Sequence, residues 1–171
     1  MFNDTYKNKK VLVTGHTGFK GTWLISWLKI LGAEVAGIAL EPNTNPSIYN
    51  EFKNYVEIKD HRKNIENFED IKKIISEFKP DFIFHLAAQA LVSESYKDPK
   101  KTWETNLVGT TNILELLRNY EQDCIAIIIT SDKCYKNLEI KRGYNEEDIL
   151  GGDDNYSASK ASAELVINSY Q

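Results

Sequence analysis

Short apolar runs alternate with longer amphipathic stretches along this chain. The short runs are rich in Val, Ile and Leu and end at glycine or in polar loops, which predicts strands over residues 9–15, 33–40, 54–58, 81–88 and 124–130. In the stretches between them apolar residues recur at helical spacing, which predicts helices over residues 20–32, 68–78, 99–120 and 157–170. Pro99 falls in the first turn of the third of these helices, a position that proline favours.

This alternation predicts an α/β fold, a doubly wound parallel sheet with helices on both faces. Continuous apolar strands, such as residues 125–129, are expected to be buried on both sides. The length of 171 residues is enough for one domain with a real core, so we treat residues 1–171 as a single domain. Ligands bind such sheets outside the carboxyl ends of the strands, and the polar clusters of this sequence fall at those ends or on the following helix.

A glycine turn follows the first predicted strand. The sequence GHTGFKG places Gly15, Gly18 and Gly21 between a strand and a helix, a spacing that allows a tight turn and close approach of a pyrophosphate to the backbone. This predicts a Rossmann-type dinucleotide site. The predicted cofactor-binding residues of the turn are Gly15, His16, Thr17, Gly18, Phe19, Lys20 and Gly21.

Two residues of this turn are unusual for such a site. His16 and Lys20 bring bulk and possible charge to positions where small or apolar groups are common. Either both side chains point to solvent, or Lys20 reaches a phosphate, or one of them disturbs the cofactor contact. The third alternative predicts weak NAD binding.

The end of the second strand decides between NAD and NADP. The strand ends in GIALEP, where no acid stands clearly in place to hold the adenosine ribose and Glu41 lies too far along. No arginine is apparent for a 2′-phosphate, so NAD is favoured. Asp60, after the third predicted strand, either hydrogen-bonds the adenine amine or caps a turn.

The composition argues against a nucleic-acid-binding, membrane or secreted protein. Charged residues make up 27% of the chain and the net charge is -4, which gives no sign of a nucleic-acid partner or an anionic membrane surface. No apolar run reaches the ~20 residues of a membrane span, and the start MFNDTYKNKK lacks the apolar core of a secretory signal. The two cysteines fit a reducing compartment, so a cytoplasmic location is expected.

Two further clusters carry chemistry. The sequence TSDKCY places Ser131, Asp132 and Lys133 at the end of the last predicted strand. The sequence YSASK places Tyr156 and Lys160 four residues apart, on one face of the last helix. A phenol with an ordinary pKa of about 10 is a poor base, but a cation one turn away and a positive nicotinamide ring both favour the phenolate.

From Lys10 onward the chain resembles the extended short-chain dehydrogenases/reductases. The resemblance rests on the glycine turn, the strand-end Ser131, the YxxxK pair, and the sequence HLAAQ with Asn106 on the following helix. It implies that Ser131 orients a substrate hydroxyl, that Tyr156 takes its proton, and that Lys160 binds the nicotinamide ribose and lowers the tyrosine pKa. Leu86, Ala87, Ala88, Tyr156 and Lys160 are then further NAD contacts.

Within this superfamily the chain is most similar to the nucleotide-sugar 4,6-dehydratases. They carry an acid-base pair after the strand-end hydroxyl, and here the pair is Asp132 and Lys133. The resemblance implies a nucleotide-sugar substrate, with CDP-glucose favoured over dTDP-glucose because SDK replaces the commoner TDE. Asp132 is expected to protonate the departing C6 hydroxyl. Lys133 either loses its charge by burial and removes the C5 proton, or stays charged and stabilises the enolate while water is the base.

These dehydratases are about twice as long as this chain, so we expect it to be an N-terminal portion that lacks the substrate-binding part, possesses weak activity at best, and associates through exposed surfaces. A homo-oligomer, dimer or tetramer, is expected. Two alternatives stay open: a nucleotide-sugar epimerase or reductase of the same superfamily, and a non-catalytic dinucleotide-binding protein.

Overall fold

The computed structural model describes residues 2–171, which form two compact units. The first unit contains residues 2–87 and 119–129, and the second contains residues 88–118 and 130–171. The first unit therefore holds the glycine turn. The second holds both residues 131–134, here called the Ser131 turn, and the YxxxK pair.

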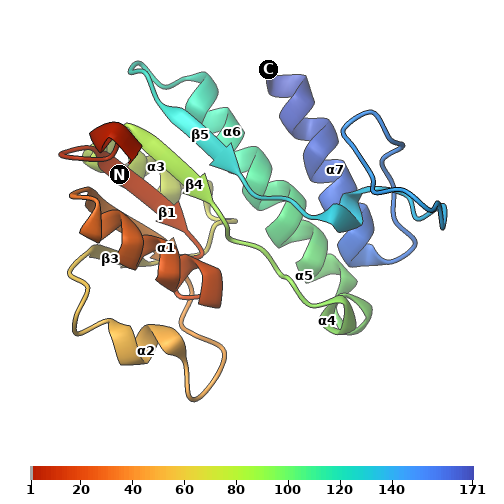
Figure 1. The fold of residues 1–171 in the computed structure, drawn as a ribbon, viewed down its shortest axis with the longest axis horizontal. Coiled ribbons are helices and arrows are strands. Elements are labelled where there is room, and N and C mark those ends of the chain that lie inside the picture. Colours follow the sequence, from red (N-terminus) through yellow and green to blue (C-terminus); the bar gives the residue numbers. More distant parts are fainter. Residues whose placement is uncertain (1) are drawn as a thin grey trace. The chain divides into compact units, whose positions relative to one another are not determined.

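The first unit is built on a parallel sheet of five strands within residues 2–171, in the order β3-β2-β1-β4-β5 (Figure 1). The strands are β1 (Lys10–Thr14), β2 (Glu34–Ala39), β3 (Lys59–Arg62), β4 (Phe82–His85) and β5 (Ile125–Ile128). Because β1 stands between β2 and β4, the strand order reverses there, and the carboxyl end of β1 is the switch point at which such sheets bind ligands. The predicted α/β fold with a doubly wound parallel sheet is confirmed.

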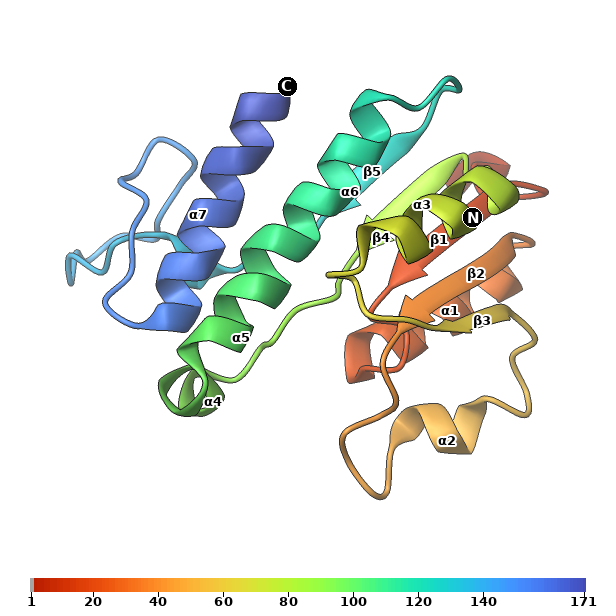
Figure 2. The ribbon, with the colours of Figure 1, turned by 180° about the vertical axis from the view of Figure 1, so that it is seen from behind.

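Helices cover both faces of this sheet. Helix α1 (Phe19–Ile30) lies on the face seen in Figure 1, and α3 (Phe68–Phe78) on the face seen in Figure 2. Successive side chains along each strand point to opposite faces of the sheet. On the α1 side the core contains Val11, Val13, Ile25, Leu28, Ala33, Val35, Tyr49 and Phe82. Helix α3 buries Ile71, Ile74, Ile75 and Phe78, and each such side chain contributes about 1.5–3 kcal/mol by leaving water.

The third strand was predicted at the wrong place. Residues 54–58 form turn and coil, and β3 begins only at Lys59. Val56 and Ile58 still pack against the core on the α1 side, which explains the apolar pattern that suggested a strand. The true strand is polar because it lies at an edge of the sheet, paired on one side with β2 from Ala36 to Ala39. The short helix α2 (Ile48–Phe52), which precedes it, was not predicted.

The prediction of a buried last strand was also wrong. Strand β5 pairs with β4 alone within the described residues, and Ile125 and Ile129 are 58% and 40% exposed. A strand at the edge of a sheet leaves one row of backbone groups and part of its side chains uncovered.

The second unit is helical. It contains α4 (Val92–Lys97), α5 (Pro99–Trp103), the π-helical turn η2 (Glu104–Val108), α6 (Gly109–Arg118), the 3₁₀ turn η3 (Asp132–Cys134) and α7 (Asn155–Tyr170). The helix predicted over residues 99–120 is therefore interrupted by one π turn. It has Pro99 in its first turn, as expected, and Asp98 caps it. Among residues 2–171, no helix has the length and apolar character needed to cross a membrane.

Candidate functional site

The glycine turn joins β1 to α1 at the switch point of the sheet. Gly15 has φ +76°, a left-handed conformation that favours glycine. A Cβ atom built on Gly15 would lie 2.8 Å from the backbone nitrogen of Ala87, and one built on Gly21 would lie 2.2 Å from the carbonyl oxygen of Gly15. The first and third glycines are therefore required so that the turn can pack against the end of β4 and against the first turn of α1.

Gly18 has a different role. It caps α1 with extended backbone and supplies no side-chain hydrogen bond to the amides of the first helical turn. Gly18, Phe19 and Lys20 are exposed, so those amides and the positive end of the helix dipole are open to an anion. The turn thus fits the pyrophosphate of a dinucleotide, the group that the glycine spacing predicts.

His16 does not point to solvent. Its side chain has no exposed surface, so the first of the three alternatives for this residue was wrong. The ring lies over Gly37 of β2, where a built Cβ atom would come within 2.4 Å of it. Burial lowers the pKa of His16 below its ordinary value, against the opposing effect of Asp60, and so favours the neutral ring. Lys20, by contrast, is exposed.

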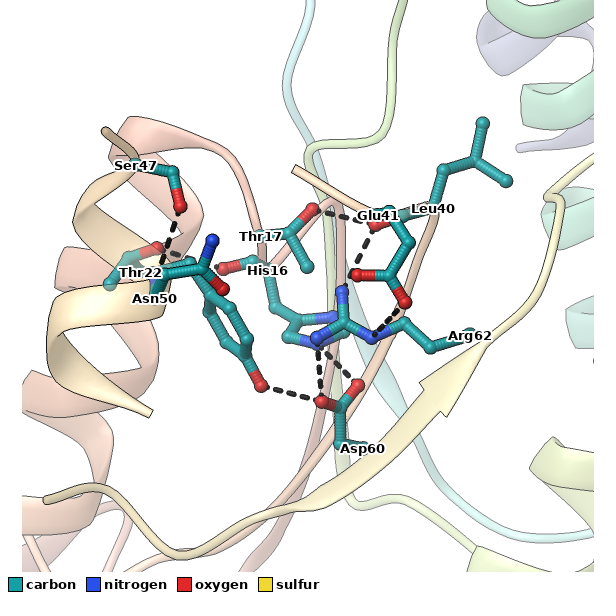
Figure 3. Close-up of polar contacts among 10 residues, drawn as sticks. His16, Thr17, Thr22, Leu40, Glu41, Ser47, Asn50, Asp60 and Arg62 are labelled. Carbon is teal, nitrogen blue, oxygen red and sulfur yellow. Dashed lines mark hydrogen bonds and ion pairs between the residues drawn. The ribbon is translucent and has the colours of Figure 1, made fainter. Parts of the chain in front are cut away.

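Asp60 is the partner of the buried His16, as Figure 3 shows. His16 Nε2 lies 2.9 Å from Asp60 Oδ1 and must be the donor, because a carboxylate only accepts. The other oxygen accepts the Tyr49 hydroxyl at 2.6 Å and Arg62 Nη2 at 2.8 Å. Asp60 thus lies within β3 and does not cap a turn.

The charge state of Asp60 follows from these partners. Burial by itself raises the pKa of the carboxyl, but the hydrogen bonds from Tyr49 and His16 and the charge of Arg62 outweigh it and hold the pKa below its ordinary value. Burial, together with the bond to Asp60, raises the pKa of Tyr49, so its hydroxyl remains a donor. Asp60 is therefore an anion that binds together the glycine turn, α2 and β3.

Sequence reasoning missed Arg62 and Tyr49. Arg62 donates from Nη1 to the carbonyl oxygen of Leu40 at 3.1 Å, and its Nε lies 3.6 Å from Glu41 Oε1 (Figure 3). A guanidinium therefore stands at the carboxyl end of β2, and the expectation that no arginine is present there was wrong. Arg62 was overlooked because the third strand was predicted over residues 54–58, which places Arg62 in the following loop, whereas it is the last residue of β3.

The end of β4 lies beside the glycine turn. Thr14 Oγ1 lies 2.7 Å from His85 Nδ1 and accepts a hydrogen bond from the backbone nitrogen of Ala87 at 3.1 Å. Leu86 donates its backbone N–H to the carbonyl oxygen of Thr14 at 3.1 Å. These bonds hold Leu86 and Ala87 beside Gly15. Ala88, the next predicted contact, is the first residue of the second unit.

The Ser131 turn is a compact 3₁₀ turn in the second unit. Ser131 Oγ accepts the backbone N–H of Lys133 at 3.2 Å and lies 3.2 Å from Asp132 Oδ1. The carbonyl oxygen of Ser131 accepts the N–H of Cys134 at 3.0 Å. Asp132 and Lys133 are exposed, whereas Cys134 is buried. The turn therefore leaves Asp132 and Lys133 exposed next to Ser131, while the Cys134 side chain is buried beneath it.

Tyr156 and Lys160 lie one turn apart on α7, which packs against the Ser131 turn. Both are buried, with 9% and 5% exposed. Burial lowers the pKa of Lys160, while Glu164 and Cys134 oppose that effect. The second unit therefore brings together all five predicted catalytic residues, Ser131, Asp132, Lys133, Tyr156 and Lys160.

Asn106 fixes the other side of α7. It lies in the π turn η2, is 1% exposed, and donates to Ser159 Oγ at 2.9 Å and to the carbonyl oxygen of Gln89 at 3.1 Å. Gln89 returns its backbone N–H to Asn106 Oδ1 at 2.8 Å. A π turn often marks a functional site, because it displaces one side chain from the regular helical row.

Comparison with known proteins agrees with this geometry. The model of a protein family described as GDP-mannose 4,6 dehydratase matches residues 12–171. The chain belongs to this family of nucleotide-sugar 4,6-dehydratases. It is 44% identical over 166 residues to CDP-glucose 4,6-dehydratase of Salmonella typhimurium, a match that covers 97% of this chain and 46% of the relative. The resemblance inferred from the motifs is confirmed.

Solved structures show the same fold. The UDP-glucose 4-epimerase of Thermus thermophilus in complex with NAD is 29% identical, with a TM-score of 0.79 over 94% of this chain and 50% of the epimerase. The dTDP-glucose 4,6-dehydratase of Bacillus anthracis in complex with NAD is 26% identical, with a TM-score of 0.75 over 95% of this chain and 50% of the dehydratase. The chain spans about half the length of the curated relatives that it matches.

Proposed function

We propose that the protein carrying this chain dehydrates CDP-glucose to CDP-4-dehydro-6-deoxyglucose with NAD as a recycled cofactor. The observation that carries this proposal is the Ser131 turn, in which an acid and a lysine follow the hydroxyl, packed against the helix that holds Tyr156 and Lys160. The relative from Salmonella typhimurium, named CDP-glucose 4,6-dehydratase, supports the choice of substrate.

The first unit supplies the cofactor site. The open amides that follow Gly18 donate to the pyrophosphate, and Gly15 allows it to approach the backbone beside Ala87. Asp60, held by three donors, faces the adenine amine in this proposal. When bound there, NAD would supply the hydride acceptor for C4 of the sugar and the hydride donor for C6.

The second unit supplies the oxidation chemistry. Tyr156 takes the proton of the C4 hydroxyl while the C4 hydride departs, and Ser131 orients that hydroxyl. Lys160, a buried cation one turn away, holds the nicotinamide ribose and stabilises the negative charge that develops on the phenol. The product of this step is a C4 ketone, which acidifies the proton on C5.

Elimination then removes water across C5 and C6. The C5 proton leaves to Lys133 or, if Lys133 stays charged, to water, with Lys133 stabilising the enolate. Asp132 donates a proton to the C6 hydroxyl, which departs as water. Because the product carries a new hydrogen at C6 and a proton again at C5, the net reaction is loss of one water molecule.

The test is to incubate the whole protein that carries these residues with NAD and CDP-glucose, and to follow the sugar by NMR. A 4-keto-6-deoxy product formed without net NADH supports the proposal, and dTDP-glucose in parallel measures the preference for the nucleotide. A C4 epimer as product would instead establish the epimerase alternative. Calorimetric NAD binding without turnover of either sugar nucleotide would establish the non-catalytic alternative.

We also propose that the protein acts as a homo-oligomer. Helix α1 carries Phe19, Trp23 and Trp27 at helical spacing on its outer face, with 69%, 51% and 47% exposed. Aromatic residues at this density on a surface are typical of interfaces. Light scattering of the purified protein tests this: a monomer at micromolar concentration contradicts it.

A further inference from the structure

Thr130 and Glu164 are joined by a hydrogen bond that the proposed reaction does not use. Thr130 directly precedes Ser131, and Glu164 lies on α7, one helical turn after Lys160. The Thr130 hydroxyl donates to Glu164 Oε1, and both side chains are partly buried. The bond therefore links the residue before the Ser131 turn to the helix of Tyr156 and Lys160.

The Ser131 turn is held internally by bonds between neighbouring residues. Ser131 accepts from Lys133 and Cys134, and Cys134 is buried as an anchor. Such local bonds set the shape of the turn but not its place along α7. A bond from Thr130 to α7 sets that place, because Thr130 is adjacent to the turn and Glu164 belongs to a long rigid helix.

Glu164 also acts on the charge of Lys160. The Lys160 side chain is almost fully buried, and burial disfavours its ammonium form. The titratable groups that oppose this effect are Glu164, from α7 itself, and Cys134, from η3. Of the other elements packed against α7, α5 and η2 bond it through Trp103 to Asn155 and through Asn106 to Ser159. Helix α6 contributes Glu115, which accepts the Tyr170 hydroxyl at the last residue of α7. The carboxylate of Glu164, one helical turn after Lys160, therefore favours the ammonium form of Lys160.

Stabilisation of the helix does not account for this arrangement. Lys160 and Glu164 are the charged residues of the segment Asn155–Tyr170, and they occur in the order lysine then glutamate. Isolated helices are stabilised less by this order than by glutamate four residues before lysine. A partly buried carboxylate also costs free energy unless it is bonded. The presence of Glu164 is explained if its carboxylate binds the Thr130 hydroxyl and stabilises the Lys160 ammonium.

We propose that Glu164 is a positioning residue, which holds the Ser131 turn in place through Thr130 and keeps a negative charge beside the Lys160 ammonium. The inference rests on the proposed function, in which Ser131, Tyr156 and Lys160 act on the same hydroxyl. Glu164 touches none of the reacting atoms and acts through Thr130 and Lys160.

Three substitutions separate the two parts of this role. Glu164→Gln keeps an acceptor for Thr130 but removes the charge. Thr130→Val keeps the charge and nearly the same shape but removes the hydroxyl. Thr130→Ser keeps the hydroxyl and is the conservative rescue. Glu147→Gln, an exposed acid in the loop before α7, is the matched control for loss of one negative charge.

Two measurements are made on the whole protein that carries this chain. The first is the titration of Lys160 by NMR of lysine labelled at Cε, with the resonance assigned from its loss in Lys160→Arg. The second is kcat against pH for the sugar nucleotide that the protein turns over. Circular dichroism verifies that each variant is folded.

For Glu164→Gln we expect Lys160 to titrate at lower pH than in the parent, and the high-pH limb of kcat to move to lower pH with it. For Thr130→Val we expect kcat to fall by about 10-fold to 10²-fold with the Lys160 titration unchanged, and Thr130→Ser to recover most of the loss. Glu147→Gln changes neither quantity.

Unchanged Lys160 titration and an unchanged pH profile in folded Glu164→Gln overturn the electrostatic part of the proposal. Parental kcat in Thr130→Val overturns the positioning part, even if Glu164→Gln does not fold. Absence of turnover in the parent itself contradicts the proposed function instead, and the NMR titration then still decides whether Glu164 sets the charge of Lys160.

Discussion

His16 Nε2 lies 2.9 Å from Asp60 Oδ1, although the histidine side chain is entirely buried and the aspartate side chain is 30% exposed. The buried ring thus joins the glycine turn to a carboxylate 44 residues further along the chain. A neutral His16 completes this pair, because protonating a buried ring is costly.

This pair predicts how stability depends on pH. Because the pKa of His16 is lowered from 6.5, the unfolded chain binds more protons at this ring than the folded chain does below pH 6.5. The contribution to stability is therefore complete above pH 6.5 and declines as the pH falls. We expect Tm to decrease as the pH falls below 6.5.

The control compares His16→Gln with His61→Gln in thermal scans across this range. His16→Gln is expected to be less stable at pH 7.5 by about 1–3 kcal/mol, since Asp60 loses a buried donor, and to show a flatter pH dependence. The assignment to His16 is wrong if Tm depends on pH in His16→Gln as it does in the parent, while His61→Gln shows a changed dependence.

Gly15→Ala should weaken both folding and cofactor binding. Its Cβ atom would stand 2.8 Å from the backbone of Ala87, and φ at this position is +76°. We expect a loss of more than about 1 kcal/mol in stability and at least a tenfold loss in NAD affinity, measured by denaturation and calorimetry. Gly143→Ala is the matched control, because no atom lies within 4 Å of a Cβ built there. Equal behaviour of the two variants contradicts the assignment of the turn.

Tyr156→Phe should abolish oxidation at C4 while NAD binding stays nearly intact. The hydroxyl contacts the substrate in our proposal, and the phosphates are held by the glycine turn. Stopped-flow absorbance of NADH after mixing with sugar nucleotide measures the first half-reaction. Tyr96→Phe, at an exposed position on α4, is the control. Formation of NADH at the parental rate in Tyr156→Phe shows that another group is the base.

Lys133→Met should separate oxidation from elimination. The variant is expected to reduce bound NAD and then to stall, because the C5 proton cannot leave. Exchange of that proton with solvent deuterium, followed by NMR, should fall together with turnover. Lys136→Met, an exposed lysine three residues further on, should exchange normally. Parental exchange in Lys133→Met limits Lys133 to an electrostatic role.

Asp132→Asn should behave in the opposite way. Exchange at C5 is expected to persist, while loss of the C6 hydroxyl slows by about 10²–10⁴, the usual contribution of a general acid. Rapid-quench analysis of the sugar products measures the two steps separately. If C5 exchange falls as far as elimination does, Asp132 acts before the C6 hydroxyl departs, and its assignment as the acid is wrong.

Much of the fold was predictable because it depends on local pattern. Apolar runs located β1, β2, β4 and β5, and helical spacing located α1, α3 and α7 to within a few residues. Strand β3 was misplaced because an edge strand with exposed, charged positions has no apolar run to reveal it. The exposure of β5 was missed for a related reason: composition shows that a strand is apolar, but only its neighbours decide whether it is covered.

By itself, the sequence determined the parallel α/β sheet, the glycine turn at its switch point, and the two groups of candidate catalytic residues, because each depends on residues close together in the chain. Only the tertiary structure decided that His16 is buried against Asp60, that Arg62 stands at the end of β2, and that Thr130 is bonded to Glu164. Each of these pairs joins positions more than twenty residues apart. Such contacts arise when parallel strands and their crossover helices bring distant segments side by side. The pattern of neighbouring residues in the chain does not predict which distant segments will be in contact.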